Sequence, residues 1–159
     1  MRLTSPAFRP QGEIPQRFTC EGANVSPPLS IDGDVARAKS LALVVDDADA
    51  DNGSWVHWIV YNLPATTTVI RQGKTAPLPV GACEGTNSWR GVGWSGPCPP
   101  EGRHRYVFTL FALDLVLPDL DEPTKEELEQ AMHGHVVDAA RLVGTYEMQL
   151  LPRHEATRV

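Results

Sequence analysis

The sequence predicts a single domain, spanning residues 1–159, of mainly β structure with many turns and few helices. Its 159 residues suffice for one hydrophobic core. The 14 prolines and 13 glycines interrupt the chain often, which favours short strands joined by loops over a helical bundle. Apolar runs rich in β-branched or aromatic residues, at 40–45, 55–63 and 107–113, have the length and composition of strands.

Charge and hydropathy narrow the classes of partner. The formal net charge of −6 disfavours a general affinity for nucleic acid or for anionic membrane surfaces. No apolar run approaches the length of about 18 residues that a transmembrane helix needs. No apolar signal segment follows residues 1–6. We therefore expect no integral membrane contact, no nucleic-acid partner and a cytoplasmic location.

The cysteines show no metal-binding or redox motif. The chain has three of them, Cys20, Cys83 and Cys98, and none forms a C-x-x-C pair. An odd number of cysteines in a protein expected in the cytoplasm indicates reduced thiols. The sequence predicts no metal site and no cofactor.

Prolines shape the first part of the chain. Apolar residues alternate loosely over 1–19 between prolines, which predicts an edge strand followed by an extended arm. Residues 20–29 then form a polar loop stiffened by Pro27 and Pro28. The run at 40–45 is almost continuously apolar, as expected for a strand buried on both faces.

An acidic segment at 46–53 follows this strand. Neighbouring carboxylates repel one another and favour turns, so we interpret most of them as solvated, namely Asp46, Asp49 and Asp51. A calcium loop that begins at Asp47 is excluded, because its twelfth position would be Trp58 rather than glutamate.

The next strand, 55–63, carries a histidine among apolar residues. Alternation places Trp55, His57, Ile59 and Tyr61 on one face of this strand. A single histidine on such a face is most often a core residue whose hydrogen bonds are satisfied. A binding role for His57 is the alternative.

A long connection and a stiff loop precede the third strand. Residues 71–92 are polar and broken by prolines and glycines, which predicts a long, loosely structured connection. Prolines and glycines also crowd 93–103, directly before His104 and Tyr106. A rigid loop beside a strand often holds binding groups, and a solvent-facing connector is the alternative. The G-x-G-x-x-G match at 91–96 is no nucleotide site, because prolines follow it where a helix is needed.

The last part of the chain predicts helices and a returning strand. Thr124 and Glu127 form a capping box, and Gly134 is placed to end the helix that follows. Apolar residues at 136–142 predict a second short helix. Alternation at 142–150 predicts a strand that returns to the sheet.

Polar groups stand next to the buried strands at four positions: Asp47, His57, His104 and Tyr106. If the strands are neighbours, these groups converge on one concavity. Histidine and tyrosine donors, with backbone N–H groups of a glycine-rich loop, can hold an anion. Asp47 can then orient His57 by accepting its ring N–H, or share a proton with a bound phosphate. Acid–base chemistry is open to the same groups, but no nucleophile accompanies them, so binding is the simpler function.

Two blocks of sequence carry a family resemblance. The first joins Asp47-Ala48-Asp49-Ala50 to Trp55-x-His57-Trp58, and the second is Gly96-Pro97-Cys98-Pro99-Pro100-x-Gly102-x-His104-Arg105-Tyr106. They are similar to the D-P-D-A-P, W-x-H-W and G-x-x-P-P-x-G-x-H-R-Y motifs of the phosphatidylethanolamine-binding protein family. Shorter matches at 24–29 and 144–146 point to its bacterial and archaeal Raf-kinase-inhibitor-like branch.

The resemblance implies an antiparallel β-sandwich with Greek-key-like connections and short flanking helices near the C-terminus. It also implies a small pocket for phosphate-type anions. The residues that match the pocket and its proline-rich rim are Asp47, Trp55, His57, Gly96, Cys98, Pro100, His104 and Tyr106. Ala48 and Asp51 stand where the family usually has prolines, which predicts a looser and more acidic rim.

We therefore expect a binding protein and no enzyme. Its ligand would be a phospholipid headgroup, a phosphorylated metabolite or a phosphorylated residue of a partner. The alternative is a regulatory inhibitor of a kinase or protease that acts through partner binding. A weak hydrolase that uses Asp47 and His57 is the third and least favoured hypothesis. The resemblance also permits a homodimer.

Overall fold

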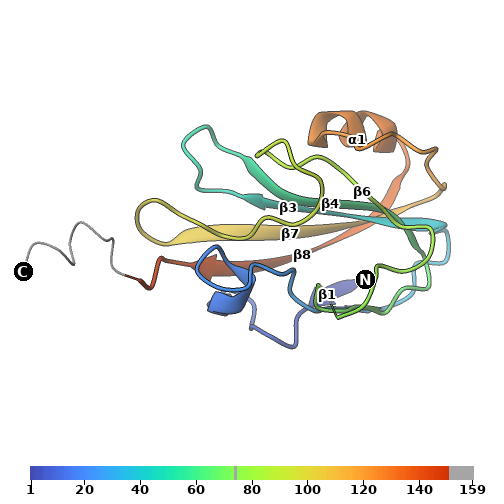
Figure 1. The fold of residues 1–159 in the computed structure, drawn as a ribbon. Coiled ribbons are helices and arrows are strands. Elements are labelled where there is room, and N and C mark those ends of the chain that lie inside the picture. Colours follow the sequence, from blue (N-terminus) through green and yellow to red (C-terminus); the bar gives the residue numbers. More distant parts are fainter. Residues whose placement is uncertain (74, 151–159) are drawn as a thin grey trace, which may run out of the picture.

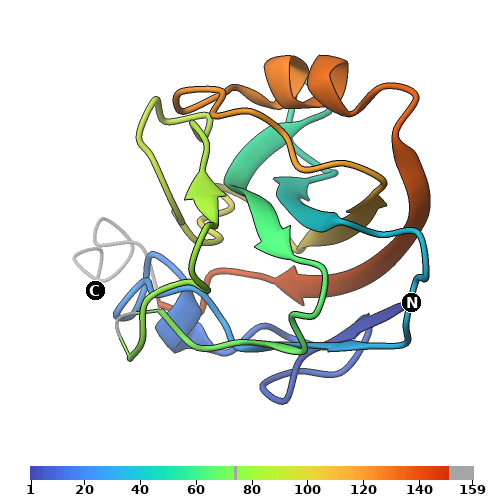
Figure 2. The ribbon, with the colours of Figure 1, turned by 90° about the vertical axis from the view of Figure 1, so that its right-hand side faces the viewer.

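Two antiparallel β-sheets lie face to face, and one helix covers the outer face of the larger sheet (Figures 1 and 2). The computed structural model describes residues 1–73 and 75–150. The larger sheet has five strands in the order β6-β4-β3-β7-β8, and the smaller has three in the order β1-β2-β5. The predicted mainly β, antiparallel sandwich is thus confirmed.

The bounds of the elements follow the apolar runs closely. The larger sheet consists of β3 (Ser40–Asp47), β4 (Trp55–Pro64), β6 (Cys83–Glu84), β7 (His104–Leu113) and β8 (Val136–Tyr146). The smaller sheet consists of β1 (Arg2–Thr4), β2 (Leu29–Asp32) and β5 (Val69–Ile70). Helical segments are a short 3-10 helix, η1 (Gln16–Phe18), and α1 (Lys125–Met132). After β4 the chain visits β5 and β6 before β7 returns beside β3, which is a Greek-key-like path.

The central strand β3 is buried on both faces, as its apolar run predicts. Leu41, Leu43 and Val45 lie in the core between the two sheets. Ala42 and Val44 point to the other side, where they join Leu128 and Met132 of α1 in a second core. Each large apolar side chain buried in this way contributes about 1.5–3 kcal/mol to stability.

The predicted capping box at the start of α1 is present. The Thr124 side chain accepts a hydrogen bond from the Glu127 backbone N–H, and the Glu127 side chain accepts one from the Thr124 backbone. The helix ends before Gly134, which has a φ of +81°. A left-handed residue of this kind is what a helix end commonly requires. This helix is not long and apolar enough to cross a membrane, and the same holds for every helix in the described part of the chain.

The predicted second helix at 136–142 is wrong. These residues belong to β8, which pairs with β7 from Val136, opposite Leu113, to Tyr146, opposite His104. Valine and alanine at 136–140 fit a helix or a strand by local pattern. Pairing along the whole length of β7 favours the strand, because it gives the backbone N–H and C=O groups of both segments their hydrogen-bond partners.

The predicted face of β4 is also wrong in part. Val45 pairs with Trp58 whereas Asp46 pairs with Val56, so His57 is an extra residue that forms a β-bulge. A bulge changes which face each side chain takes. Ile59 consequently lies in the core beneath α1, and His57 is free to face another direction.

Two of the three cysteines form a disulfide, so the expectation of reduced thiols is wrong for them. Cys20 and Cys98 are bonded across 78 positions of sequence, with a Cα–Cα distance of 5.5 Å. Their spacing gives no local sign of pairing, because the fold alone brings the two loops together. Cys83 is a free thiol.

Candidate functional site

A cavity of about 900 Å³ opens at the end of the sandwich where β3 and the loops before β4 and β7 meet. Its walls contain all but one of the site residues expected from the sequence, namely Asp47, Trp55, His57, Cys98, Pro100, His104 and Tyr106. The remaining one, Gly96, lies outside the lining. Additional lining residues are Ala50, Asp51, Asn52, Trp89, Pro99 and Glu101.

Strand pairing places the polar groups beside one another. Asp47 is the last residue of β3, and it lies opposite Trp55 on β4 and opposite Tyr106 on β7. The expected convergence of these groups therefore follows from β3 lying between β4 and β7. His57 reaches the same space because it is the bulged residue of β4.

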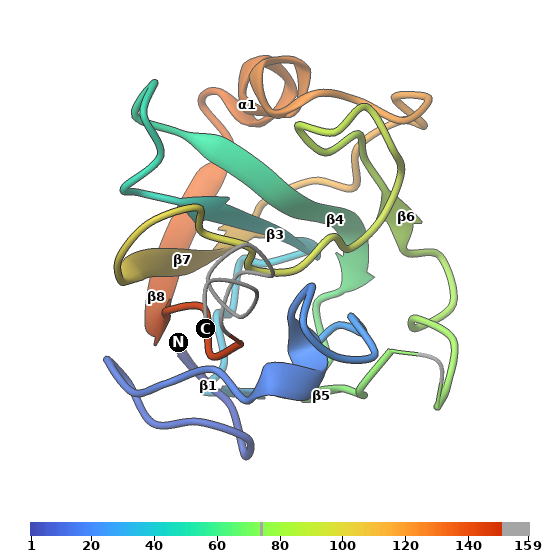
Figure 3. The ribbon, with the colours of Figure 1, turned by 60° about the vertical axis from the view of Figure 1, so that its left-hand side comes forward.

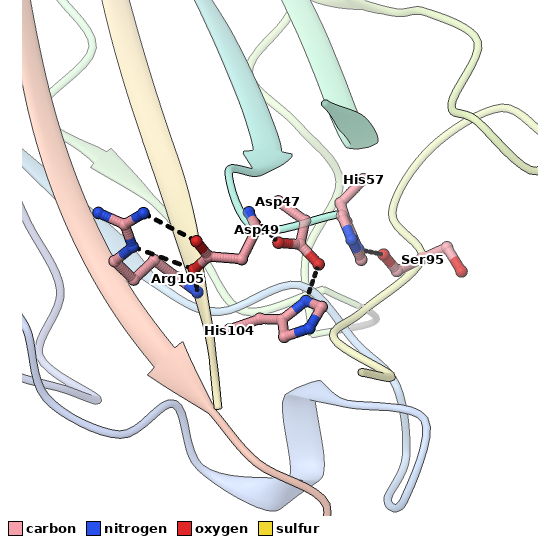
Figure 4. Close-up of polar contacts among 6 residues, drawn as sticks. All are labelled: Asp47, Asp49, His57, Ser95, His104 and Arg105. Atoms are coloured by element: carbon pink, nitrogen blue, oxygen red, sulfur yellow. Dashed lines mark hydrogen bonds and ion pairs between the residues drawn. The ribbon is translucent and has the colours of Figure 1, made fainter. Parts of the chain in front are cut away.

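Asp47 is held in two contacts inside the cavity wall. The Nδ1–H of His104 donates to Asp47 Oδ2 at 2.6 Å, and the backbone N–H of Asp49 donates to Asp47 Oδ1 at 2.8 Å (Figure 4). The idea that Asp47 orients His57 is therefore wrong, because its partner is His104. This pairing fixes the ring of His104 and leaves Nε2 as its remaining polar atom.

His57 is oriented by the loop before β7 instead. Its Nδ1–H donates to the carbonyl oxygen of Ser95 at 2.5 Å (Figure 4). The residue is only 2% exposed. Burial lowers the pKa of His57, and the Ser95 carbonyl and the Asp47 charge oppose this shift only in part. The ring therefore favours its neutral form, with Nε2 as the atom not used by Ser95.

Tyr106 has a buried hydroxyl group with no hydrogen-bond partner among the described residues. The residue is 1% exposed, and its ring meets that of His57 edge to face at a centroid distance of 5.2 Å. Burial, followed by the neighbouring Asp47 carboxylate, raises the pKa of Tyr106 above its usual value. The hydroxyl thus stays protonated and can donate. Leaving such a group unpaired costs about 1–3 kcal/mol, which makes this hydroxyl a candidate for a ligand contact.

Two tryptophans form the outer wall of the cavity. The ring of Trp89 lies edge to face with Trp55, at a centroid distance of 5.4 Å, and with His57, at 4.8 Å. Trp89 is 45% exposed. The Asn87 side chain holds the turn that carries it, since its Oδ1 accepts from the backbone N–H groups of Trp89 and Gly91. Sequence reasoning missed Trp89, because it sits in a segment whose only signal is polar and irregular composition.

The acidic segment is less solvated than its sequence suggests. Asp49 accepts two hydrogen bonds from the Arg105 side chain, at 2.8 and 3.0 Å, and these lower the pKa of Asp49 to about 2. Asp46 accepts from Lys125 Nζ at 2.9 Å. The interpretation of both as solvated is wrong, because their partners lie far away in sequence. Asp51 is exposed, as expected, and lines the cavity.

The rim before β7 is tied to the loop that contains η1 (Figure 3). The Gly96 backbone N–H donates to Asn24 Oδ1 at 2.8 Å, and the Cys20 N–H donates to the Pro97 carbonyl at 3.1 Å. A Cβ atom at Gly96 would meet the Phe18 carbonyl oxygen. Gly96 therefore acts on the cavity by permitting this close approach and not by lining it.

Positive and metal-binding groups are scarce at this site. None of the described lining residues is a lysine or an arginine, whereas Asp47, Asp51 and Glu101 are acidic. Within the described residues, no cluster of histidine, cysteine or carboxylate side chains is arranged to hold a metal ion. The Tyr106 hydroxyl is therefore the neutral donor available to a ligand, whereas Nε2 of neutral His57 is an acceptor, because its one N–H is used by Ser95.

Comparison with known proteins gives a consistent match. Residues 4–147 match the family model described as phosphatidylethanolamine-binding protein. The UPF0098 protein of Methanothermobacter thermautotrophicus is 46% identical over 148 residues, which cover 92% of this chain and 98% of that protein.

Solved structures show the same fold. A phosphatidylethanolamine-binding protein homologue from Chlamydia trachomatis superposes with a TM-score of 0.87 at 42% identity, over 93% of this chain and 97% of the other. E. coli YbcL, described as a member of the mammalian family, has a TM-score of 0.86 at 28% identity, over 93% of this chain and 98% of the other.

Proposed function

Because the chain belongs to the phosphatidylethanolamine-binding protein family, we propose that its cavity binds a phosphate-type anion. The observation that carries this proposal is the Tyr106 hydroxyl, which is buried, protonated and without a partner among the described residues. His57 and His104 stand beside it in the same wall, each with one ring nitrogen already fixed by a protein acceptor. A phosphoryl oxygen would accept from the hydroxyl.

The acidic character of the wall favours a phosphoryl group that still carries a proton. Such a group can donate its P–O–H to a carboxylate such as Asp47 or to Nε2 of neutral His57, while another of its oxygens accepts from the Tyr106 hydroxyl. A fully ionised phosphate would instead face Asp47, Asp51 and Glu101 without a lysine or arginine in the described lining. We therefore propose a phosphate monoester in its singly ionised form, which keeps one P–O–H, as the preferred chemistry.

The mouth of the cavity supports an ammonium group on the same ligand. Trp55 and Trp89 present aromatic rings there, and Asp51 and Glu101 are exposed carboxylates in the same lining. Aromatic faces and carboxylates both attract cations. A ligand with a phosphoryl group inside and an ammonium group at the mouth, such as phosphoethanolamine, fits this division better than phosphate alone.

Binding rather than catalysis is the function we propose. The His104–Asp47 pair resembles the base and orienting group of a hydrolase, but a nucleophile is needed beside it. Among the described lining residues, the cysteine sulfur of Cys98 is held in a disulfide. A partner protein remains the second candidate, because Trp89 lines the cavity and is exposed, and tryptophan is common at interface centres.

Isothermal titration with inorganic phosphate and with phosphoethanolamine tests the proposal. The double variant His57→Ala, Tyr106→Phe removes the Tyr106 hydroxyl donor and the Nε2 acceptor of His57, and each hydrogen bond to a charged group is worth about 1.5–3 kcal/mol. We expect its Kd to rise by more than about 100-fold. The matched control is His135→Ala, Tyr61→Phe, which changes the same residue types outside the cavity. Unchanged affinity in the first double variant contradicts the proposal.

A further inference from the structure

The Cys20–Cys98 disulfide lies at the rim of the cavity and is open to solvent. Both cysteines are exposed, and Cys98 is itself a lining residue. A disulfide sulfur that solvent reaches is also within reach of a thiolate, whereas a buried one is not. Cys83 is half-buried in β6 and does not line the cavity.

This disulfide joins a fixed loop to the rim. The fixed side is the loop after η1, where the Glu21 carboxylate accepts from the Tyr146 hydroxyl at 2.6 Å and from the backbone N–H groups of Gln149 and Leu150. Cys20 is the residue next to Glu21, so its sulfur is anchored through the end of β8. The disulfide transmits that anchoring to Cys98.

The rim beyond Cys98 has few other ties. Up to Pro97 the loop is held by two hydrogen bonds. The Gly96 N–H donates to Asn24 Oδ1, and the Cys20 N–H donates to the Pro97 carbonyl oxygen. From Cys98 to Gly102, no hydrogen bond to other described residues is present. Pro99 and Pro100 lack an N–H and cannot add one. The disulfide at Cys98 is therefore the last strong contact that holds the loop before residues 99–101, which line the cavity.

Movement of the rim would change the position of the group that orients His57. The Ser95 carbonyl that orients His57 lies in the same loop, three positions before Cys98. The Ser95 N–H donates back to the His57 carbonyl at 3.0 Å, so the loop and β4 are coupled at this point. A looser rim would thus widen the cavity and release the acceptor that fixes His57.

We infer that Cys20–Cys98 is a site of thiol–disulfide exchange, and that its reduction weakens ligand binding in the adjoining cavity. This inference rests on the proposed anion-binding function. The reactant is a dithiol, either a small molecule or the C-x-x-C pair of a reductase. In a reducing compartment such as the proposed cytoplasmic location, the open form would be favoured.

The exchange proceeds in two balanced steps. One thiolate of the dithiol attacks a cysteine sulfur, the S–S bond breaks, and the other cysteine leaves as a thiolate that takes a proton. The second thiol of the reductant, as its thiolate, then attacks the reductant sulfur of the mixed disulfide, and the remaining protein cysteine leaves as a thiolate that takes a proton. Two electrons pass to the protein, Cys20 and Cys98 become thiols, and the dithiol becomes a disulfide.

Two measurements on the full chain test this inference, with inorganic phosphate as the probe. Titration of the oxidised and the dithiol-reduced protein should show Kd higher by about five- to tenfold after reduction, as expected when the closed rim is populated a fifth to a tenth of the time. Reoxidation should restore the original Kd. Amide exchange of Cys20 and Gly96, whose N–H groups tie the rim, should become faster in the reduced form.

Variants separate the disulfide from general thiol effects. Cys20→Ser removes the bond without substituting a residue that lines the cavity, and it should bind like the reduced parent whether or not a reductant is present. Cys83→Ser is the matched control and should respond to reduction as the parent does. Far-UV circular dichroism and thermal melting report whether the reduced protein stays folded.

The outcomes distinguish this inference from the proposed function. Equal Kd and equal amide exchange in both redox forms overturn the inference and leave anion binding intact. Global unfolding on reduction also overturns it, because the disulfide would then hold the whole fold and not the rim. If neither form binds phosphate, the proposed function fails. Amide exchange at Cys20 and Gly96 then decides by itself whether the disulfide holds the rim: faster exchange after reduction supports this role, and equal exchange overturns it.

Discussion

Replacing Tyr106 by phenylalanine should weaken phosphate binding while leaving the protein at least as stable as the parent. The hydroxyl is buried without a partner among the described residues, so its removal relieves an unpaired polar group in the ligand-free state. In the complex the same change removes a donor to a charged oxygen, worth about 1.5–3 kcal/mol. We expect Kd to rise by about 10- to 150-fold. Titration calorimetry and urea unfolding measure the two effects separately.

Tyr61→Phe is the matched control for this result. Tyr61 is equally buried, but its hydroxyl accepts from the Leu120 backbone N–H at 3.0 Å and lies 3.3 Å from Asp119 Oδ1. Its removal should therefore cost about 1 kcal/mol of stability and leave Kd unchanged. If Tyr106→Phe lowers stability as Tyr61→Phe does and leaves Kd unchanged, the Tyr106 hydroxyl has a structural role and not a binding role.

Replacing Gly96 by alanine should have the largest effect of any single methyl group added near the cavity. The new Cβ would stand about 2.1 Å from the Phe18 carbonyl oxygen, a backbone atom that cannot turn away. Either the rim or the η1 loop must shift, which also breaks the bond from Gly96 N–H to Asn24. We expect a loss of about 2–4 kcal/mol in the free energy of unfolding, together with weaker phosphate binding.

Gly91→Ala provides the comparison in the preceding turn. A Cβ there would be 3.7 Å from the Asn87 side chain, which is ordinary van der Waals contact. Its stability should stay within about 0.5 kcal/mol of the parent. Urea unfolding of both variants, read by tryptophan fluorescence, checks the pair. Equal stability of Gly96→Ala and Gly91→Ala would show that the rim does not approach the η1 loop as closely as described.

The strands could be predicted from sequence wherever burial on both faces leaves a continuous apolar run. The strands β3 and β7 are of this kind, and their residues lie at the predicted positions. The edge strand β8 is different, since much of its first half is exposed or half-buried. Its local pattern at 136–142 suits a helix equally well, and only the distant partner β7 decides its conformation.

The candidate site was predictable as a set of residue types but not as a set of contacts. Asp47, His57 and His104 stand beside apolar strands, so topology alone predicts that they meet. The bulge at His57 decides which of the two histidines contacts Asp47. No residue pattern in β4 predicts that bulge. The disulfide was missed for a similar reason, because 78 positions separate its two cysteines.

The crystal structure of this protein soaked in phosphate, or in phosphoethanolamine, tests anion binding in the cavity most directly. We expect a phosphoryl oxygen about 2.5–2.7 Å from the Tyr106 hydroxyl, the length of an O–H donor bond to an anionic oxygen. Nε2 of His57 or of His104 should form a second hydrogen bond with the phosphoryl group from the same wall. A fully occupied anion elsewhere on the surface, with the Tyr106 hydroxyl still unpaired at saturating ligand, would contradict the proposed function.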